Sequence, residues 1–481
     1  MNAVTLLRDA ARRHPERAAF LERGTSITFG ALWERVCRFS GGLHARGFAP
    51  GDGALIAIPM SVELYLALLA VLKEGGVAVF LDPWVGKRTM IELARHANLK
   101  AWLGTPKSHL LRLFVRGVDI APLSVRRFEG PLREEMYDAH DQDRALITYT
   151  TGSSGRPKGV NRTHRILVAQ HERLAEAFPS IEGDVDYCAF AVFALNNLAL
   201  GVTTSLDDPA AATTATASPP FFDALEPRPK FRRILTGGAP VTDLQLRRWM
   251  EKWPEAEIAI AYGSSEAEPV AHITAEERLR AGGRGYVAGK IVEGVRARIE
   301  PISSSVPRSS SGSSGDIAAE ELRGTRGTEE PVIGELLVAG DHVCRDYDHD
   351  PHATRKNKVF DDDGTVWHRM GDTGWFDEEG LFRIAGRVHS TIWRYGVPVH
   401  AQLVEQAALG DDARIKRVAA VAVGAKVAVV VESDDDVADD VRARLADAGE
   451  PCDIVLVTRE PLPVDPRHQS KIDYDKLRAR L

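Results

Sequence analysis

Residues 149–160 read Tyr149-Thr150-Thr151-Gly152-Ser153-Ser154-Gly155-Arg156-Pro157-Lys158-Gly159-Val160 and follow the apolar run 145–148. The apolar run predicts a strand, and the glycines, serines and threonines after it predict a loop whose backbone bends easily and exposes its N–H groups. Arrays of N–H groups bind anions, and Lys158 adds a positive charge, so the loop suits a polyphosphate. It is not a Walker P-loop, because no G-x-x-x-x-G-K-[ST] occurs and Pro157 interrupts the Gly-Lys junction. From composition alone, a flexible surface loop is the alternative.

Composition and charge exclude several classes of protein. The chain of 481 residues is long enough for two or more domains, and its formal net charge of −7 argues against a general nucleic-acid binder. The four cysteines lie far apart without a C-x-x-C pair, which fits reduced thiols better than disulfides or a zinc site. The first residues do not read as a signal peptide, and the apolar region 64–81 is too interrupted for a membrane span. These observations predict a soluble cytoplasmic enzyme without a transmembrane segment.

Short apolar strands alternate with helical patterns through the first two thirds of the chain. Residues 54–58 predict a strand, 62–73 a helix and 77–81 a second strand. This alternation predicts an α/β fold with mostly parallel sheets. A Ser/Gly/Pro patch between residues 303 and 315 reads as an exposed loop. Near the C-terminus, strand patterns at 418–423 and 427–431 and a helix pattern at 437–448 predict a small α+β unit.

The order of residues in 149–160 resembles the signature loop of the adenylate-forming superfamily, which includes acyl-CoA synthetases, peptide-synthetase adenylation domains and luciferases. Further motifs follow in the family's order over nearly the whole chain. The resemblance implies a large N-terminal domain for AMP and acyl binding, 1–386, and a small mobile C-terminal domain, 387–481, that acts as a catalytic lid. It also implies that the enzyme uses ATP and Mg²⁺. The loop residues that it assigns to ATP or AMP are Thr150, Thr151, Gly152, Ser153, Ser154, Gly155 and Lys158.

A second motif, Tyr262-Gly263-Ser264-Ser265-Glu266, resembles the family's Y-G-x-T/S-E pattern. The resemblance implies that Tyr262 stacks on adenine and that Glu266 helps to hold Mg²⁺, an ion that prefers hard oxygen ligands. Alone, the motif is also typical of a turn. Its position after Gly237-Gly238-Ala239, which resembles the family's adenine-side segment, favours nucleotide binding. By the same resemblance, Gly263 and Ser265 also contact ATP or AMP.

A third motif, Arg369-Met370-Gly371-Asp372, resembles the family's R-T-G-D pattern. The resemblance implies that Asp372 accepts hydrogen bonds from both ribose hydroxyls, for which a carboxylate with two oxygens is suited. An aspartate in a glycine-bracketed turn is the alternative. Gly386-Arg387-Val388-His389-Ser390 occupies the family's hinge motif, so Arg387 is expected to approach the nucleotide. His389 replaces the usual hinge Asp or Lys, a change that a hinge tolerates because it only absorbs a backbone rotation.

The C-terminal stretch Gln469-Ser470-Lys471-Ile472-Asp473 resembles the family's last motif, with Ser470 in place of the usual glycine. The resemblance implies that Lys471 is the catalytic lysine of adenylation. When a substrate carboxylate attacks the α-phosphate, negative charge concentrates on the approaching oxygens, and a positioned ammonium stabilises it. A solvated surface lysine is the alternative. The implied catalytic residues are therefore Lys471, Glu266 and Arg387.

Four stretches, 105–110, 366–372, 393–399 and 463–468, resemble the β-lactone synthetases of bacterial long-chain olefin biosynthesis. This resemblance implies ATP-dependent adenylation of a β-hydroxy fatty acid, followed by attack of the β-hydroxyl on the activated carbonyl and closure to a β-lactone with release of AMP. The step is favoured because nucleophile and electrophile share one molecule. The sequence identifies no base for closure; His164 is one candidate, and a structural histidine is the alternative. The region 206–231 is shorter than expected, since it lacks room for a helix-strand unit that would border the acyl pocket.

Two other functions compete with lactone formation. One is an acyl-CoA or carrier-protein ligase with the same acyl-AMP intermediate, and the other is a non-catalytic nucleotide-binding homologue. Retention of Lys158, Glu266, Asp372, Arg387 and Lys471 argues against the latter. The expected partner is a small-molecule carboxylic acid; CoA and nucleic acid are not expected, and enzymes of the same pathway are candidate partners.

Overall fold

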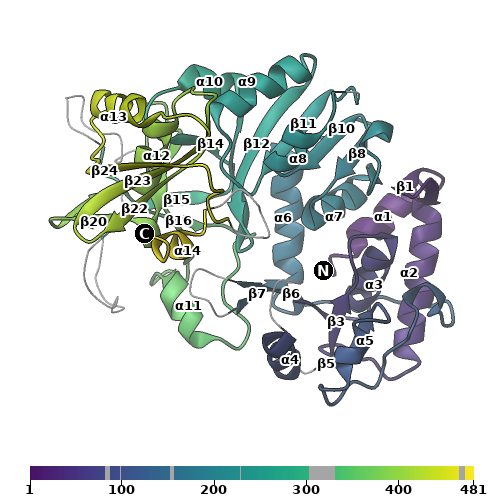
Figure 1. The fold of residues 1–481 in the computed structure, drawn as a ribbon. Coiled ribbons are helices and arrows are strands. Elements are labelled where there is room, and N and C mark those ends of the chain that lie inside the picture. The colour runs from purple at the N-terminus through teal and green to yellow at the C-terminus, as the bar shows by residue number, and fades with distance from the viewer. Residues whose placement is uncertain (82–86, 98, 152–156, 228, 303–330, 465–471) are drawn as a thin grey trace.

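The computed structural model describes residues 1–81, 87–97, 99–151, 157–227, 229–302, 331–464 and 472–481. Their strands form a five-stranded sheet, a 14-stranded sheet, a two-stranded hairpin and a three-stranded sheet. The chain passes from the N-terminal helices through the large sheet to a C-terminal group of elements, and helices lie against the sheets (Figure 1). The predicted α/β fold class is therefore confirmed.

The five-stranded sheet carries the two strands that flank the predicted phosphate loop. Strands β5, β3, β4 and β6 pair in parallel, and β7 pairs antiparallel to β6 at the edge. Residues 152–156, between β6 and β7, lie outside the described residues. The strand bounds are Gly53–Ala57 (β3), Val77–Leu81 (β4), Leu99–Gly104 (β5), Arg144–Thr151 (β6) and Pro157–Thr163 (β7).

Helix α3 (Val62–Lys73) shows how the sequence determines this part of the fold. The Ser61 hydroxyl caps the helix by accepting a hydrogen bond from the backbone N–H of Leu64. Every residue from Leu64 to Lys73 is buried, as expected of a helix that is apolar on all sides. The helix and the following strand have the predicted bounds, and the preceding strand differs from the prediction by one residue.

The 14-stranded sheet is mixed and positions most of the candidate site. Its order is β15-β16-β18-β19-β14-β13-β12-β11-β10-β8-β9-β1-β2, with β17 beside β18. The strands from β12 to β1 in this order pair in parallel. The bounds are Ala18–Glu22 (β1), Thr25–Thr28 (β2), Val185–Cys188 (β8), Thr203–Ser205 (β9), Thr214–Ala217 (β10), Arg233–Gly237 (β11), Glu257–Ser264 (β12), Ala267–Thr274 (β13), Tyr286–Ile291 (β14), Arg296–Pro301 (β15), Gly334–Ala339 (β16), Lys358–Phe360 (β17), Val366–Phe376 (β18) and Phe382–Arg387 (β19).

Helices cover these two sheets. Their bounds are Thr5–Arg13 (α1), Phe29–His44 (α2), Lys87–His96 (α4), His109–Arg112 (α5), His164–Ala177 (α6), Ala191–Leu200 (α7), Pro219–Ala224 (α8), Asp243–Lys252 (α9), Ala275–Ala281 (α10) and Pro351–Asn357 (α11). Short 3₁₀ turns occupy Val125–Arg127, Pro209–Ala211 and Val388–Ser390. Among the described residues, none of the helices is both long and apolar enough to cross a membrane.

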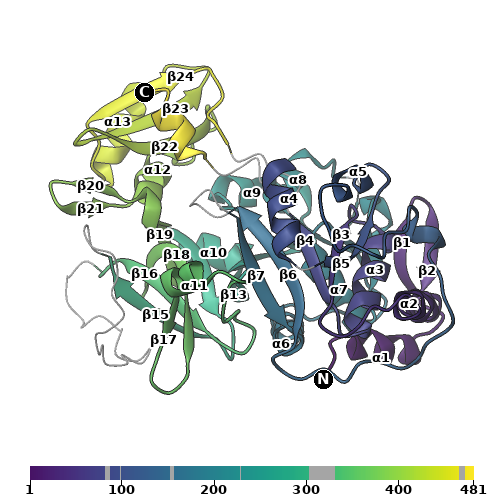
Figure 2. The same ribbon diagram turned by 90° about the horizontal axis from the view of Figure 1, so that it is seen from below.

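The C-terminal elements form a group with its own apolar core, which includes Val404, Val429 and Val441. Figure 2 shows this group beyond the end of β19, on the far side from α1 and α2. The predicted boundary at residues 386–387 falls at the end of β19, and its role as a hinge stays a prediction. The bounds are Ile392–Arg394 (β20), Val397–Val399 (β21), Ala401–Leu409 (α12), Ile415–Val423 (β22), Lys426–Ser433 (β23), Ala438–Asp447 (α13), Ile454–Thr458 (β24) and Tyr474–Arg478 (α14).

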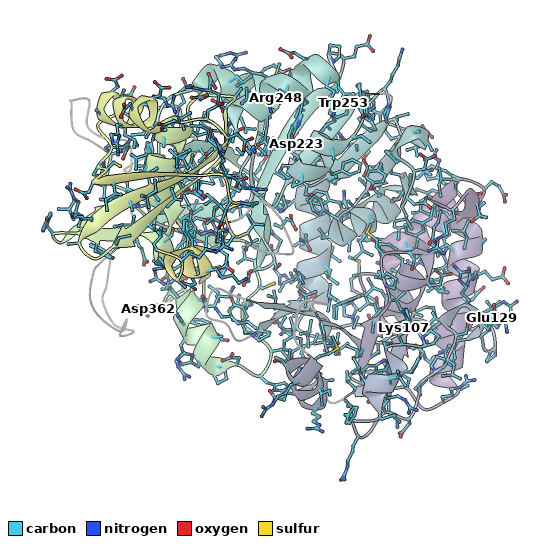
Figure 3. All side chains as sticks on the ribbon, viewed as in Figure 1. Lys107, Glu129, Asp223, Arg248, Trp253 and Asp362 are labelled. Atoms are coloured by element: carbon cyan, nitrogen blue, oxygen red, sulfur yellow. The ribbon has the colours of Figure 1, made fainter. Side chains whose placement is uncertain are left out.

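The abbreviated region 206–231 folds around an aromatic cluster. Only a 3₁₀ turn, β10 and the short helix α8 lie between β9 and β11 among the described residues. The Phe222 ring of α8 lies 5.6 Å from Trp249 and 6.0 Å from Trp253, measured between ring centroids. Trp249 Nε1 donates to Asp223 Oδ1 at 2.9 Å; Asp223 and Trp253 are labelled in Figure 3. Aromatic contacts therefore pack α8 against α9 and the following turn without the expected longer unit.

Candidate active site

Asp372 is a buried carboxylate at the centre of a polar triad. The residue is 5% exposed, and its carboxylate accepts a hydrogen bond from the Tyr262 hydroxyl at 2.6 Å through Oδ2. The other oxygen, Oδ1, lies 2.8 Å from Arg387 Nε. Burial, and then the Asp372 charge, raise the pKa of Tyr262, and that same charge raises the pKa of Arg387. The triad therefore consists of a neutral phenol, a carboxylate and a guanidinium.

Strand register brings these three residues together. Asp372 in β18 pairs with Arg387 at the end of β19, and Tyr262 lies near the end of β12. On its other side, β18 places Arg369 opposite Leu337 and Thr373 opposite Glu335, so its backbone bulges between these pairs. Gly371, inside the bulge, has φ +72°, a conformation that glycine adopts without strain. The bulge directs Asp372 toward Tyr262, and its carboxylate keeps lone pairs on both oxygens for further donors such as a vicinal diol.

Gly237, Gly238 and Ala239 lie at the end of β11, next to the strand that carries Tyr262. Gly237 pairs with Ala261, and a Cβ on Gly237 would lie 2.6 Å from the Ala261 carbonyl oxygen. Only glycine permits this close approach. Gly238 has φ +78°. The structure thus brings the predicted adenine-side segment next to Tyr262.

Glu266 occupies the turn between β12 and β13 and has several polar neighbours. Its Oε1 accepts a hydrogen bond from the Tyr347 hydroxyl at 2.7 Å, and its backbone oxygen accepts one from the Cys344 N–H at 2.8 Å. Burial alone would raise the pKa of Glu266, but His368, the Tyr347 hydrogen bond and Lys358 together lower it. Glu266 is therefore ionised at neutral pH and offers oxygens of the kind that Mg²⁺ prefers.

Two lysines lie over the Tyr347 ring. Lys158 Nζ is 5.6 Å and Lys358 Nζ 5.7 Å from the ring centroid. Lys358 is 3% exposed and donates to the Cys344 carbonyl oxygen, and burial lowers its pKa to about 8. Burial, and then the neighbouring Lys358, lower the pKa of His368 to about 3. His368 is therefore neutral, and the two lysines give the surroundings of Glu266 a positive charge that favours polyanions.

Tyr347, Lys358 and His368 are site residues that sequence reasoning misses. Tyr347 and Lys358 come from separate segments, and neither belongs to a local motif. His368 belongs to a stretch that carries the family resemblance, but the resemblance assigns it no role. His368 could have been found from its position, because it directly precedes the motif Arg369-Met370-Gly371-Asp372.

The residues around Glu266 fit one protein ligand for Mg²⁺. No group of three or more metal-ligating side chains occurs in the part of the chain that the structure describes. Mg²⁺ is usually held by one or two carboxylates together with substrate phosphates and water. A single ionised carboxylate among cations therefore suits an ion that arrives with a polyphosphate.

Some of the other predicted site residues lie within the described part of the chain and some lie outside it. Gly152, Ser153, Ser154, Gly155 and Lys471 lie outside the described residues. Thr150 and Thr151 pair with Lys158 and Pro157 through the β6–β7 register. Gly263 packs close to the Ala267 carbonyl oxygen, and the Ser265 carbonyl accepts a hydrogen bond from Arg162 at 2.6 Å. His389 is exposed and follows Arg387 by two residues. The roles proposed for these residues stay predictions.

The suggestion that His164 acts as a base is wrong. Its side chain is 0% exposed, and its Nδ1 accepts a hydrogen bond from the Ala3 N–H at 3.2 Å. Burial lowers the pKa of His164 to about 4. A fully enclosed imidazole that contacts the N-terminal segment cannot reach a substrate, so His164 is structural.

The family model for AMP-binding enzyme matches residues 7–348, which include the phosphate loop, Tyr262 and Glu266. The chain belongs to this family. The family match and the similarity to synthetases confirm the predicted class of enzyme, an AMP-forming acyl-adenylating ligase or synthetase.

Two relatives are similar to this AMP-binding enzyme over most of their length. The olefin beta-lactone synthetase of Xanthomonas campestris pv. campestris is 29% identical, over 94% of this chain and 90% of the relative. The olefin beta-lactone synthetase of Stenotrophomonas maltophilia is 28% identical, over 99% and 97% respectively. Among solved structures, ATP-bound MatB from Rhodopseudomonas palustris has a TM-score of 0.81 at 22% identity, covering 100% of this chain and 99% of that one. That likeness supports the fold from the first helix to the last.

Proposed function

We propose that this AMP-binding enzyme activates a β-hydroxy carboxylic acid with ATP and then closes the acyl adenylate to a β-lactone. The observation that carries the proposal is the Tyr262–Asp372–Arg387 triad beside Glu266, in a chain similar to two olefin beta-lactone synthetases over nearly its full length. The triad offers a ring, a carboxylate and a guanidinium to a nucleoside. Glu266 and its cationic neighbours suit the polyphosphate and its metal ion.

In the first step, an oxygen of the substrate carboxylate attacks the α-phosphorus of ATP, and the bond to pyrophosphate breaks. Asp372 accepts hydrogen bonds from the ribose hydroxyls, while the ion pair with Arg387 holds the carboxylate in place. Tyr262 contributes its ring to the adenine. Lys158 and Lys358 favour the phosphates, and Mg²⁺ bound by Glu266 would neutralise charge on them.

In the second step, the β-hydroxyl oxygen of the same substrate attacks the acyl carbonyl and loses its proton. The carbonyl carbon releases AMP, and a four-membered ring forms. No second substrate has to bind, because the nucleophile is already part of the activated molecule. Lys471, outside the described residues, is proposed to stabilise charge in the first step. Residues 387–481 are proposed to form a mobile lid over residues 1–386.

Product analysis by mass spectrometry tests this function. Purified protein is incubated with ATP, Mg²⁺ and a panel of 3-hydroxy and 2-alkyl-3-hydroxy acids, with and without CoA. We expect AMP, pyrophosphate and a product that has lost one water relative to the acid, all without CoA. A thioester that forms only with CoA would identify a ligase instead. Absence of both products across the panel would contradict acyl activation of this class.

A further inference from the structure

The Glu268 carboxyl has no partner among the described residues. Its backbone oxygen accepts a hydrogen bond from Gln170 Nε2 at 3.1 Å, but its side chain makes neither a hydrogen bond nor an ion pair in this part of the chain. The Glu268 side chain is partly buried. A polar group that is partly removed from water and has no partner costs free energy, so this carboxyl is suited to a donor that a ligand brings.

Glu268 lies directly behind the Tyr262–Glu266 segment. A Cβ added to Gly263 would lie 3.2 Å from both Cα and Cβ of Glu268, so the two backbones are in contact. Strands β12 and β13 pair Ser264 with Ala267, which fixes this approach. Tyr262 and Glu266 bracket the proposed nucleotide and metal positions, and Glu268 follows Glu266 by two residues at the start of β13.

The cation that influences Glu268 is bound elsewhere. Arg162 is the charged neighbour that affects the Glu268 carboxyl. Its Nη1 donates to Thr148 Oγ1 at 2.7 Å and its Nη2 donates to the Ser265 carbonyl at 2.6 Å. Arg162 therefore holds the strand and the turn together and leaves the Glu268 oxygens without a hydrogen bond.

We propose that Glu268 accepts a hydrogen bond from the 3-hydroxyl group of the acyl substrate and thereby selects 3-hydroxy acids over acids without that hydroxyl. This inference rests on the proposed function. Either protonation state of a carboxyl keeps an oxygen that accepts a hydrogen bond, so the contact does not depend on titration. A bound acid without the hydroxyl would cover the Glu268 carboxyl and leave it unpaired, and sites built around such a contact reject the analogue that lacks the donor. In this proposal Glu268 is a specificity-determining residue.

The test measures adenylation by ATP–pyrophosphate exchange for pairs of acids that have equal chain length and differ only in the 3-hydroxyl. For the wild type we expect kcat/KM to favour the hydroxy acid by about tenfold or more. Glu268→Leu should remove this preference mainly by lowering kcat/KM for the hydroxy acid. Glu268→Gln keeps an acceptor oxygen and should retain most of the preference for the hydroxy acid. Glu255→Leu, at an exposed position, is the matched control and should behave as the wild type.

Several outcomes would overturn the inference. These are an undiminished preference in Glu268→Leu, an equal loss of activity toward both acids, or a wild-type preference for the 3-amino analogue. If Glu268→Leu does not fold, as judged by thermal unfolding, Glu268→Ala takes its place in the comparison. A wild type that forms β-lactone while Glu268→Leu keeps its preference contradicts only this inference. A wild type that adenylates none of the acids contradicts the proposed function itself.

Discussion

Asp372 illustrates how one buried carboxylate can organise a binding site. It is held between the Tyr262 hydroxyl at 2.6 Å and Arg387 Nε at 2.8 Å, so its position is fixed before any ligand arrives. Preorganised acceptors bind a diol without losing further side-chain freedom. Removing the charge also leaves the Arg387 guanidinium without its ionic partner.

We therefore expect Asp372→Asn to weaken AMP binding by about 10- to 100-fold, the range of a lost hydrogen bond to a charged group. Isothermal titration calorimetry with AMP measures the change. Tyr262→Phe, which removes one hydroxyl but keeps the ring and the ion pair, is the matched control and should cost no more than about tenfold. Wild-type affinity in Asp372→Asn would show that the ribose is bound elsewhere.

The ion pairs of Asp412 should make the stability of the C-terminal elements depend on pH. Its carboxylate accepts hydrogen bonds from Arg414 Nε at 2.9 Å and from Arg444 Nη1 at 3.1 Å. The pKa of Asp412 is lowered, and the hydrogen bond from Arg414 is the largest cause. Because the folded pKa lies below the unfolded value of about 3.9, the stabilisation is complete above that value and is lost as the pH falls through the folded pKa.

Asp412→Asn should therefore lower the free energy of unfolding by about 1–2 kcal/mol at pH 7. The difference from the wild type should shrink as the pH falls below about 4. Urea unfolding, followed by circular dichroism at pH 7, 5 and 3.5, measures it. The exposed neighbour Asp411, replaced by Asn, should show little change at any of these pH values. A pH-independent difference for Asp412→Asn would attribute its effect to packing.

At the scale of elements, the bulge in β18 connects backbone conformation with the site. Gly371 has φ +72°, and a methyl group added to its Cα would meet no atom within 4 Å, so alanine would be strained there but would not clash. Gly364 has φ +83° with the same open space, in the turn before β18. The two glycines thus have similar backbone conformations, and only one adjoins Asp372.

Gly371→Ala and Gly364→Ala should each lower the free energy of unfolding by about 1 kcal/mol, because a side chain disfavours positive φ. Only Gly371→Ala should also weaken AMP binding, by several-fold, since relief of the strain displaces Asp372. Thermal unfolding and calorimetric titration of both variants make the comparison. Equal AMP affinities in the two variants would mean that the bulge does not position the carboxylate.

Elements with strong local signals can be predicted from the sequence, and contacts between distant segments cannot. The sequence predicts the helix at Val62–Lys73 and the strand at Val77–Leu81 with their observed bounds, because a capping serine and continuous apolar runs define them. Motif order identifies Tyr262, Glu266, Asp372 and Arg387. The pairing of Asp372 with Arg387 depends on the β18–β19 register, which no local pattern specifies. Tyr347 and Lys358 cannot be found for the same reason.

At the scale of the whole molecule, the C-terminal elements are tied to the large sheet near Gly285. Gln406 of α12 accepts a hydrogen bond from the Gly285 N–H at 2.7 Å and donates to the Gly283 carbonyl at 3.3 Å. Arg284 Nε lies 2.8 Å from Glu450 Oε1. If residues 387–481 move as a lid, these contacts have to break each time, so their strength sets how often the lid leaves this position.

Gln406→Ala should loosen this attachment without altering the nucleotide site, because Gln406 makes its hydrogen bonds to Gly283 and Gly285 and not to the triad. Loss of hydrogen bonds worth about 1 kcal/mol in total should raise the population of the detached arrangement roughly fivefold. Limited proteolysis with trypsin reports this as faster cleavage within residues 387–394, while calorimetry should give an unchanged affinity for AMP. Gln402→Ala is the matched control. Gln402 lies on the same helix, but its side chain makes no hydrogen bond to another described residue, so this variant should be cleaved at the wild-type rate. Equal cleavage of the two variants would mean that the Gly283–Gly285 contacts do not hold the C-terminal elements. A parallel loss of AMP affinity in Gln406→Ala would instead mean that the attachment helps to shape the nucleotide site.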